Sequence, residues 1–342
     1  MKVLFHADGG SRVGLGHVMR CAALANQLSR QGHKTRIAVD PALELSVHVV
    51  GQGVQALSCD STSASIREAA MAMEADCVII DSYRWTAADF RAVKGDWAVA
   101  AFDDQAVREL PVDAVINGAP AAAELGYQTA ASTRLWLGPH YQIVRSEFRG
   151  MPPHQKIGPV KRVIALVGGD DPLGLLPVLA QLLDIAAARC SFVADLICGP
   201  FAQMPKSAGL RNVTILRNPA DLRERMARAD LAISASGQTL YELARCGTPT
   251  IAFCSGPDQV HNLRALANSH VVWSVGDAAS PHWARDLSYA IEKLIGDTAY
   301  RVTMSQAGPA LIDGLGAERL VSKLESLQLE LLSFSSQSGA CN

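Results

Sequence analysis

Several features that would place this chain of 342 residues in a known class of protein are missing from it. It has no uninterrupted apolar run of 18 or more residues, so no transmembrane helix is predicted. It has no run of Lys or Arg and a formal net charge of −2, which argues against non-specific binding of nucleic acid. The apolar run at its N-terminus is too short for the core of a signal peptide. We therefore expect a cytoplasmic protein without a membrane span.

Cysteine and histidine patterns typical of metal sites are missing as well. The eight cysteines are scattered without a Cys-x-x-Cys pair, and most lie in apolar stretches, as Cys77 does. Such cysteines usually behave as small core side chains in a reducing compartment. The nine histidines show no ligand spacing. The sequence thus predicts no structural disulfide, no metal and no cofactor.

The composition allows two large hydrophobic cores. The chain is 49% hydrophobic and 19% charged, and its length suits two domains of about 150 residues each. Three prolines and two glycines between residues 150 and 160 predict an interdomain linker. We place a first domain at residues 1–152, a second at 153–325 and a C-terminal tail at 326–342.

Both halves alternate short apolar strands with segments of helical spacing. The alternation predicts two Rossmann-like, doubly wound α/β domains with mostly parallel sheets, which commonly bind ligands in the cleft between them. In the first half, strands are predicted at Lys2–His6, Thr35–Val39, Cys77–Ile80, Ala98–Phe102 and Ala114–Ile116, and a helix at His17–Gln31. In the second half, strands are predicted at Arg162–Val167, Phe192–Cys198, Val213–Leu216, Leu231–Ser234 and Thr250–Phe253, and helices at Pro172–Ala188 and Ser322–Leu332.

The first candidate site is the segment Gly14–Arg20, at the turn between the first predicted strand and the first predicted helix. Its two glycines let the backbone approach a ligand, and the free N–H groups of a helix start attract an anion. The positive helix end is expected to lower the pKa of His17 and keep its imidazole neutral, the form that acts as a base. A histidine that only caps or packs is the alternative. Asp8 could orient a neighbour or cap the loop, and Arg20 could meet a phosphate or solvent.

Two further polar turns follow predicted strands in the second half. Ser234–Glu242 places hydroxyls and backbone N–H groups at a helix start near Gln238, which suits a diphosphate. Glu242, one turn further on, could accept the two hydroxyls of a ribose. The alternative is a capping loop with Glu242 on a solvated face. In Gly256–Asn262 the polar groups are predicted at the same edge of the sheet, where Asp258 could instead be an N-cap.

Taken in order, these motifs resemble a known family over about residues 1–320. They resemble the pseudaminic-acid-pathway UDP-sugar hydrolases (PseG) and the SpsG-type predicted glycosyltransferases of spore-coat polysaccharide. The C-terminal half is more remotely similar to the lipid II-forming GlcNAc transferase. The matching pieces are Ala7-Asp8, Gly14–Cys21, Asp81-Ser82-Tyr83, Asp103-Asp104, Asn117, Gly138–Tyr141, Arg145, Glu147-Phe148, Gly168–Asp171, Ser236–Glu242, Asp258-Gln259 and Asn262.

The resemblance implies a glycosyltransferase-B (GT-B) architecture and a metal-independent reaction. His17 would activate water to attack the anomeric carbon with inversion, as in UDP-2,4-diacetamido-2,4,6-trideoxy-β-L-altropyranose hydrolase. The implied sugar-side residues are Asp8, Gly16, Arg20, Asp81, Tyr83 and Asn117. The implied UDP-binding residues are Gly168, Gly169, Ser236, Gly237, Gln238, Thr239, Glu242, Asp258, Gln259 and Asn262. The family acts in pseudaminic acid biosynthesis, for surface polysaccharide or flagellin glycosylation, and a monomer is expected.

A metal-independent inverting glycosyltransferase is the alternative that shares this fold and base. His17 would then deprotonate an acceptor hydroxyl or phosphate in place of water. Such an enzyme should have an apolar or basic acceptor groove, for which Val13, Leu15 and Trp85 are candidates, although they are equally candidates for the core. A nucleotide-sugar binding module without turnover is a third hypothesis, which predicts that His17→Ala is tolerated.

Two other enzyme classes fit the sequence less well. A dinucleotide dehydrogenase is disfavoured because Gly14-Leu15-Gly16 lacks the third glycine of the fingerprint, and only Asp40 could be its acidic residue. A metal hydrolase is disfavoured because the side chains of adjacent residues, as in Asp103-Asp104 and Asp170-Asp171, point to opposite faces of a strand. Turn and cap positions suit these acidic pairs better.

Overall fold

The computed structural model describes residues 1–9, 16–40, 54–151 and 158–338, without the side chains of Asp258 and residues 334–338. The chain forms two compact units. Unit 1 comprises Met1–Ser146 and Leu315–Asn342, and unit 2 comprises Glu147–Gly314. This division differs from the predicted one, because the last helix of the chain belongs to the first unit.

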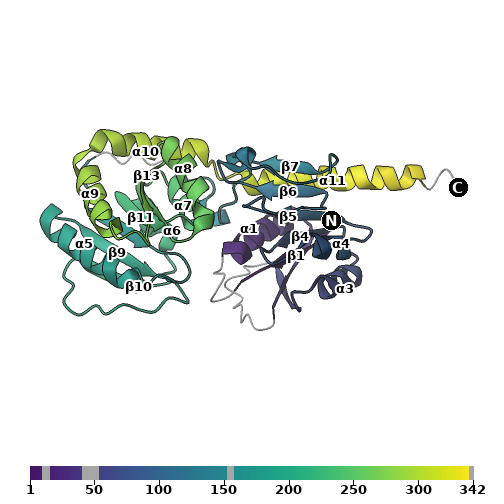
Figure 1. Cartoon of the computed structure of the whole chain (residues 1–342), viewed down its shortest axis with the longest axis horizontal. Helices are drawn as coiled ribbons and strands as arrows, with labels where there is room; N and C mark the ends of the chain where they lie inside the picture. Colours follow the sequence, from purple (N-terminus) through teal and green to yellow (C-terminus); the bar gives the residue numbers. More distant parts are fainter. Residues whose placement is uncertain (10–15, 41–53, 152–157, 339–342) are drawn as a thin grey trace. The chain divides into compact units, whose positions relative to one another are not determined.

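Unit 1 is built on a seven-stranded sheet with the order β3-β2-β1-β4-β5-β6-β7 (Figure 1). Every neighbouring pair in it is parallel. The strands are β1 (Lys2–Ala7), β2 (Lys34–Val39), β3 (Gln55–Ser58), β4 (Cys77–Asp81), β5 (Ala98–Phe102), β6 (Ala114–Asn117) and β7 (Arg134–Leu137).

Helices cover both faces of this sheet. Because successive side chains of a strand point to opposite faces, Val3 and Phe5 of β1 join one buried cluster and Leu4 joins another. The first cluster includes side chains of α1 and α11, and the second includes side chains of α3 and α4. The helices are α1 (Gly16–Arg30), α3 (Ser63–Met73), α4 (Ala87–Ala92) and α11 (Gly316–Ser338), with short 3-10 helices η1 (Ala122–Glu124), η2 (Pro139–Tyr141) and η3 (Ser146–Phe148).

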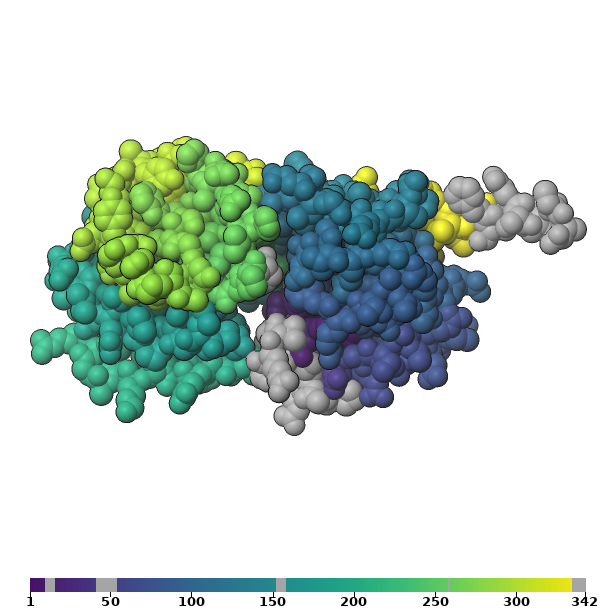
Figure 2. Space-filling view, in the orientation of Figure 1, coloured from purple at the N-terminus to yellow at the C-terminus, as the bar shows by residue number. Residues whose placement is uncertain are grey.

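Helix α11 explains why unit 1 includes the C-terminal part of the chain. Its apolar positions recur at helical spacing and are buried against α1 and the sheet, namely Ala317, Leu320, Val321, Leu324 and Leu327. The last turns of α11 extend past the rest of unit 1 (Figures 1 and 2). The predicted boundary at residue 326 therefore falls inside a continuous helix, and only residues 339–342 of the predicted tail lie outside the described part of the chain.

Unit 2 contains a six-stranded sheet with the order β10-β9-β8-β11-β12-β13, again with parallel neighbours. The strands are β8 (Arg162–Leu166), β9 (Val193–Cys198), β10 (Val213–Arg217), β11 (Leu231–Ala235), β12 (Thr250–Cys254) and β13 (Val272–Asp277). The helices are α5 (Leu176–Cys190), α6 (Leu222–Arg228), α7 (Gln238–Arg245), α8 (Val260–Asn268), α9 (Trp283–Gly296) and α10 (Thr298–Leu311), with the 3-10 helix η4 (Pro257–Gln259).

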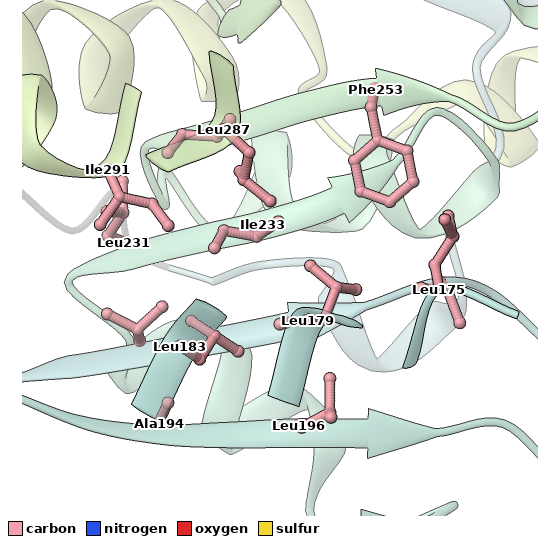
Figure 3. Close-up of a cluster of buried hydrophobic side chains, with 14 of the residues drawn as sticks. Leu175, Leu179, Leu183, Ala194, Leu196, Leu231, Ile233, Phe253, Leu287 and Ile291 are labelled. Carbon is pink, nitrogen blue, oxygen red and sulfur yellow. The ribbon is translucent and has the colours of Figure 1, made fainter. Parts of the chain in front are cut away.

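The core of unit 2 lies between its sheet and the helices α5 and α9. Figure 3 shows Leu179 and Leu183 of α5 and Leu287 of α9 directed toward strand residues such as Ile233 and Leu196. All five of these side chains are fully buried. The buried strands form because they carry near-continuous apolar runs, as expected for parallel strands that are covered on both faces.

Both strand orders follow one doubly wound pattern. Numbered within its own unit, each sheet begins with the order 3-2-1-4-5-6 of a Rossmann fold. The predicted pair of Rossmann-like domains is therefore confirmed. In such sheets the strand order reverses between strands 1 and 4, and ligands bind beyond the carboxyl ends of the strands at that point. The switch lies between β1 and β4 in unit 1 and between β8 and β11 in unit 2.

Candidate functional site

The switch point of unit 1 contains a histidine and an aspartate in direct contact. His17 lies in the first turn of α1, and Asp81 is the last residue of β4. His17 Nδ1 is 2.6 Å from Asp81 Oδ1, and the two residues are 8% and 0% exposed. An ionised carboxylate only accepts hydrogen bonds, so the shared proton belongs to Nδ1. Nε2 keeps its lone pair and has no hydrogen-bond partner among the described residues.

The structure corrects the predicted direction of the pKa shift of His17. Burial lowers the pKa of His17, but the negative charge and hydrogen bond of Asp81 outweigh it, so the pKa lies above the usual histidine value. The predicted shift took only the helix end into account, because the partner of His17 is 64 residues away in the chain. His17 is therefore one half of a histidine–aspartate pair and not an isolated imidazole at a helix start.

Arg20 bonds both carboxylate oxygens of the same aspartate. Its Nε donates to Asp81 Oδ2 at 2.5 Å and its Nη2 donates to Oδ1 at 2.7 Å. The guanidinium lies 4.9 Å from the ring centre of Phe102, and Arg20 is 9% exposed. The two positive partners keep the pKa of the buried Asp81 well below its usual range, against the effect of burial. Arg20 is therefore buried beside Asp81 and not solvated, since a buried carboxylate requires a counter-charge. Its contact with a phosphate stays a prediction.

Tyr83 and Asp104 extend this cluster toward the surface. The Tyr83 ring meets the His17 ring edge-on, with 4.6 Å between ring centres, and its hydroxyl donates to Asp104 Oδ2 at 2.9 Å. Arg20 Nη1 donates to the same oxygen at 2.7 Å. Tyr83 is 36% exposed. Asp104 was predicted only as half of an acidic pair. Its position shortly after the buried strand β5 is the sequence signal that could have placed it at this edge of the sheet.

Asp8, at the end of β1, supports the edge of the sheet beside this cluster. It is buried, and it accepts hydrogen bonds from Ser82 Oγ and Arg84 Nη2, both at 2.7 Å. The predicted orienting function thus has definite partners. Of the segment Gly14–Arg20, residues 14 and 15 lie outside the described residues, and Gly16 is the first residue of α1.

The remaining residues predicted for the sugar side are more deeply buried. Asn117 is fully buried, donates to the Tyr127 hydroxyl at 2.8 Å and accepts from the Ala119 N–H at 2.9 Å. Trp85, a candidate for an acceptor groove, is only 4% exposed and packs in the core with Phe90. The other two groove candidates, residues 13 and 15, lie outside the described part of the chain.

At the switch point of unit 2, the loop after β8 runs against the loop after β9. Gly168 has a positive φ of 103°, and a Cβ on Gly199 would lie only 2.3 Å from the Gly168 carbonyl oxygen. Glycine is therefore required for this close approach. Asp171 accepts hydrogen bonds from the Leu175 and Leu176 N–H groups and so caps α5, as predicted for this acidic pair.

The predicted helix start after β11 is confirmed. Helix α7 begins at Gln238, with Thr239 in its first turn, and its N-cap Gly237 has no side chain to occupy the helix end. The Ser236 hydroxyl donates to the Phe253 carbonyl at 2.9 Å, so in this structure it is directed to the backbone. Glu242 is buried, with 5% exposure, and not on a solvated face. The start of a helix is a place where an anion such as a diphosphate can bind.

The third candidate segment, Gly256–Asn262, contains one buried hydrogen-bond acceptor without a partner among the described residues. Gln259 Oε1 accepts from the Ser255 N–H at 2.9 Å. Asn262 Oδ1 is buried and has no hydrogen-bond partner among the described residues. An orphaned buried acceptor is unusual in a folded protein and is consistent with a site that a ligand completes. The predicted contact of Asp258 concerns a side chain outside the described ones.

Two other features that would indicate a function are missing from the described residues. In the described residues, no three His, Cys, Asp or Glu side chains are placed together so as to hold a metal ion. None of the helices in the described ranges combines the length and the apolar character needed to span a bilayer.

Comparison with solved structures defines the class of fold. Acinetobacter baumannii MurG matches with a TM-score of 0.62 and 16% identity, covering 95% of this chain and 99% of MurG. The spinosyn rhamnosyltransferase SpnG matches with a TM-score of 0.65 and 17% identity, covering 95% of this chain and all of SpnG. SpnG has also been solved in complex with thymidine diphosphate. The chain therefore has the GT-B fold of glycosyltransferases.

A curated protein is similar over nearly the full length. The chain is 23% identical to the spore coat polysaccharide biosynthesis protein SpsG of Bacillus subtilis (strain 168), across 96% of this chain and 98% of SpsG. No family model matches the chain. The expected resemblance to SpsG-type proteins is confirmed, and the resemblance to the PseG hydrolases stays a prediction.

Proposed function

We propose that this protein is a metal-independent, inverting enzyme that cleaves a nucleoside-diphosphate sugar and transfers the sugar to an acceptor hydroxyl. The observation that carries the proposal is the His17–Asp81 pair at the switch point of unit 1, with 2.6 Å between Nδ1 and Oδ1. It leaves Nε2 as the proton acceptor at the edge where doubly wound sheets bind ligands. SpsG and the GT-B neighbours support sugar transfer, in surface polysaccharide synthesis, ahead of hydrolysis.

The proposed chemical step needs only a base and a stabilised leaving group. Nε2 takes the proton of the acceptor hydroxyl while its oxygen bonds to the anomeric carbon and inverts it. The bond from that carbon to the nucleotide breaks, and its electron pair leaves with the diphosphate. Asp81 stabilises the imidazolium that forms. The start of α7, with Gly237 as its cap, would bind the diphosphate charge, and Asn262 would donate or accept at the nucleotide.

Hydrolysis is the second candidate, with water in the place of the acceptor. The specific observation in its favour is Trp85, the one described residue of the predicted apolar acceptor groove, which is buried in the core. UDP is the expected nucleotide from the family resemblance. The thymidine diphosphate bound to SpnG makes dTDP-sugars a necessary comparison.

Release of nucleotide from a panel of UDP- and dTDP-sugars tests the proposal. We expect one or more donors to release UDP or dTDP in the presence of EDTA, and His17→Asn to reduce the rate about 10²–10⁴-fold, the usual contribution of a positioned base. Release that requires an added acceptor supports transfer, and release into water alone supports hydrolysis. Full activity of His17→Asn would exclude the proposed base.

A further inference from the structure

The aspartates at the carboxyl edge of the sheet in unit 1 differ in how their carboxylate oxygens are hydrogen-bonded. Four aspartates stand at the ends of β1, β4 and β5, namely Asp8, Asp81, Asp103 and Asp104. Three of them have protein donors on both carboxylate oxygens. Asp8 bonds Ser82 and Arg84, Asp81 bonds His17 and Arg20, and Asp103 bonds the Gln105 and Ala106 N–H groups and pairs with Arg108.

Asp104 is the exception among these four. Both of its donors, Arg20 Nη1 at 2.7 Å and the Tyr83 hydroxyl at 2.9 Å, converge on Oδ2. Its Oδ1 has no hydrogen-bond partner in the described part of the chain. The Asp104 side chain is 26% exposed, so Oδ1 is open to a ligand. Two donors on one oxygen also keep the carboxylate from rotating, which presents Oδ1 in a fixed direction.

Two side chains connect Asp104 with His17, the proposed base. Arg20 bonds Asp104 with Nη1, and its Nη2 lies 3.3 Å from His17 Nδ1. Tyr83 bonds Asp104 with its hydroxyl, and its ring contacts the His17 ring. Asp104 also contributes to raising the pKa of His17 through its charge. A substrate that reaches Nε2 of His17 is therefore within reach of Asp104.

The charge balance of this edge limits what can bind beside His17. Three guanidiniums, those of Arg20, Arg84 and Arg108, face the four carboxylates, and Asp104 shares Arg20 with Asp81. With His17 neutral, the described charged groups at these strand ends leave one negative charge in excess. A second negative charge placed here would be repelled by a carboxylate of low mobility.

We infer that Asp104 is a specificity-determining residue whose open oxygen accepts a hydrogen bond from the sugar, and that this subsite selects a sugar that is uncharged or carries an amino group. Hydroxyl, amide N–H and ammonium groups all supply the required donor, whereas the ionised group of a uronate or of a sugar phosphate only accepts hydrogen bonds. The inference rests on the proposed function, because it assumes that a nucleotide sugar is the substrate. It adds the class of sugar, which the proposed function leaves open.

Asp104→Asn is a sharp test because the amide has the shape of the carboxylate. The amide oxygen can still accept from Arg20 and Tyr83, and the NH₂ group then replaces the open acceptor by a donor. Glu109→Gln is the matched control, because Glu109 forms an exposed ion pair with Arg91 on the surface of the same unit. Thermal unfolding of both variants verifies that the fold is kept.

With an active donor, Asp104→Asn should raise KM about tenfold or more, the range for a lost hydrogen bond to a charged group. The inhibition constant of free UDP should stay within about twofold, since UDP lacks the sugar. UDP-glucose and UDP-glucuronate, used as competing ligands, differ at C6 alone, where a carboxylate replaces the hydroxymethyl group. Wild type should prefer UDP-glucose, and Asp104→Asn should reduce that preference.

An unchanged KM, or an unchanged ratio between the two probes, would overturn the assignment of Asp104. Equal weakening of UDP and of the nucleotide sugars would also overturn it, because it indicates a structural effect. Failure of wild type to release nucleotide from any donor would instead overturn the proposed function. Calorimetric binding of the same two probes would then still measure the preference.

Discussion

At the scale of the residue, the pair of His17 and Asp81 determines what the site can do. Burial alone would lower the pKa of His17, and the adjacent carboxylate reverses the shift. The same carboxylate fixes which ring nitrogen carries the proton. A base with a raised pKa is a stronger proton acceptor, which suits the deprotonation of a hydroxyl.

Asp81→Asn should reduce kcat by about 10²-fold or more, because the amide removes the charge that stabilises the imidazolium. The substitution also leaves the buried Arg20 short of a counter-charge, so thermal unfolding must accompany the assay. A folded Asp81→Asn protein with the wild-type kcat would show that the carboxylate is not part of the reaction.

The pH dependence of kcat/KM should follow the state of His17. Only the neutral imidazole accepts a proton, so activity falls as the pH falls through its pKa. Since the pKa of His17 is raised, the midpoint of this acidic limb should lie above the ordinary value of about 6.5. In Asp81→Asn the midpoint should move to lower pH. Equal midpoints in the two proteins would contradict the proposed pairing.

Single residues of this site could be predicted from the sequence, but the contacts between them could not. His17 was predicted from a glycine-rich turn at the end of a strand, and Asp81 was implied by the family resemblance. The contact between them, and the convergence of Arg20 and Tyr83 on Asp104, depend on which strands are neighbours in the sheet. Spacing along one chain carries little information on that order.

At the scale of the element, local signals were reliable where a buried strand or a cap was strong. Strand β5 occupies its predicted range, and β1 and β4 each extend one residue further. The edge strands β3 and β7 were not predicted, because their exposed residues break the apolar run. Helix α5 begins later than predicted, at Leu176, because Gly174 has a positive φ of 65°, which does not fit a right-handed helix.

The capping box of α4 provides a test at this scale. Thr86 and Asp89 each bond the other's backbone N–H, which satisfies two donors at the helix start. Thr86→Ala should lower the free energy of unfolding by about 1 kcal/mol. The matched control is Thr303→Ala on the exposed face of α10, where alanine is the better helix former. Equal losses in chemical denaturation would argue against the cap.

At the scale of the whole molecule, the chain returns to its first unit. Helix α11 completes the core of unit 1, so residues from both ends of the chain share one hydrophobic cluster. The helical spacing of apolar residues predicted a helix at Ser322–Leu332, but a linker-like segment at 150–160 suggested a single crossing between domains. Which core the last helix joins is decided by packing, which is not visible in the sequence.

Leu320→Ala should therefore destabilise unit 1 by about 2–5 kcal/mol, because it opens a cavity at a fully buried position of α11. Leu329→Ala, on the part of α11 that is 68% exposed, should change stability by less than about 0.5 kcal/mol. Urea denaturation measures both. A small effect of Leu320→Ala would contradict the placement of α11 in the core of unit 1.

The most direct test of the central claim is the protonation state of His17 in the folded protein, which requires no substrate. Nitrogen-15 NMR distinguishes the two ring nitrogens, with His17→Asn to assign the signals. We predict a proton on Nδ1 and none on Nε2 at alkaline pH, and a titration midpoint above about 6.5. A proton on Nε2 in the neutral ring, or a midpoint below that value, would contradict the account.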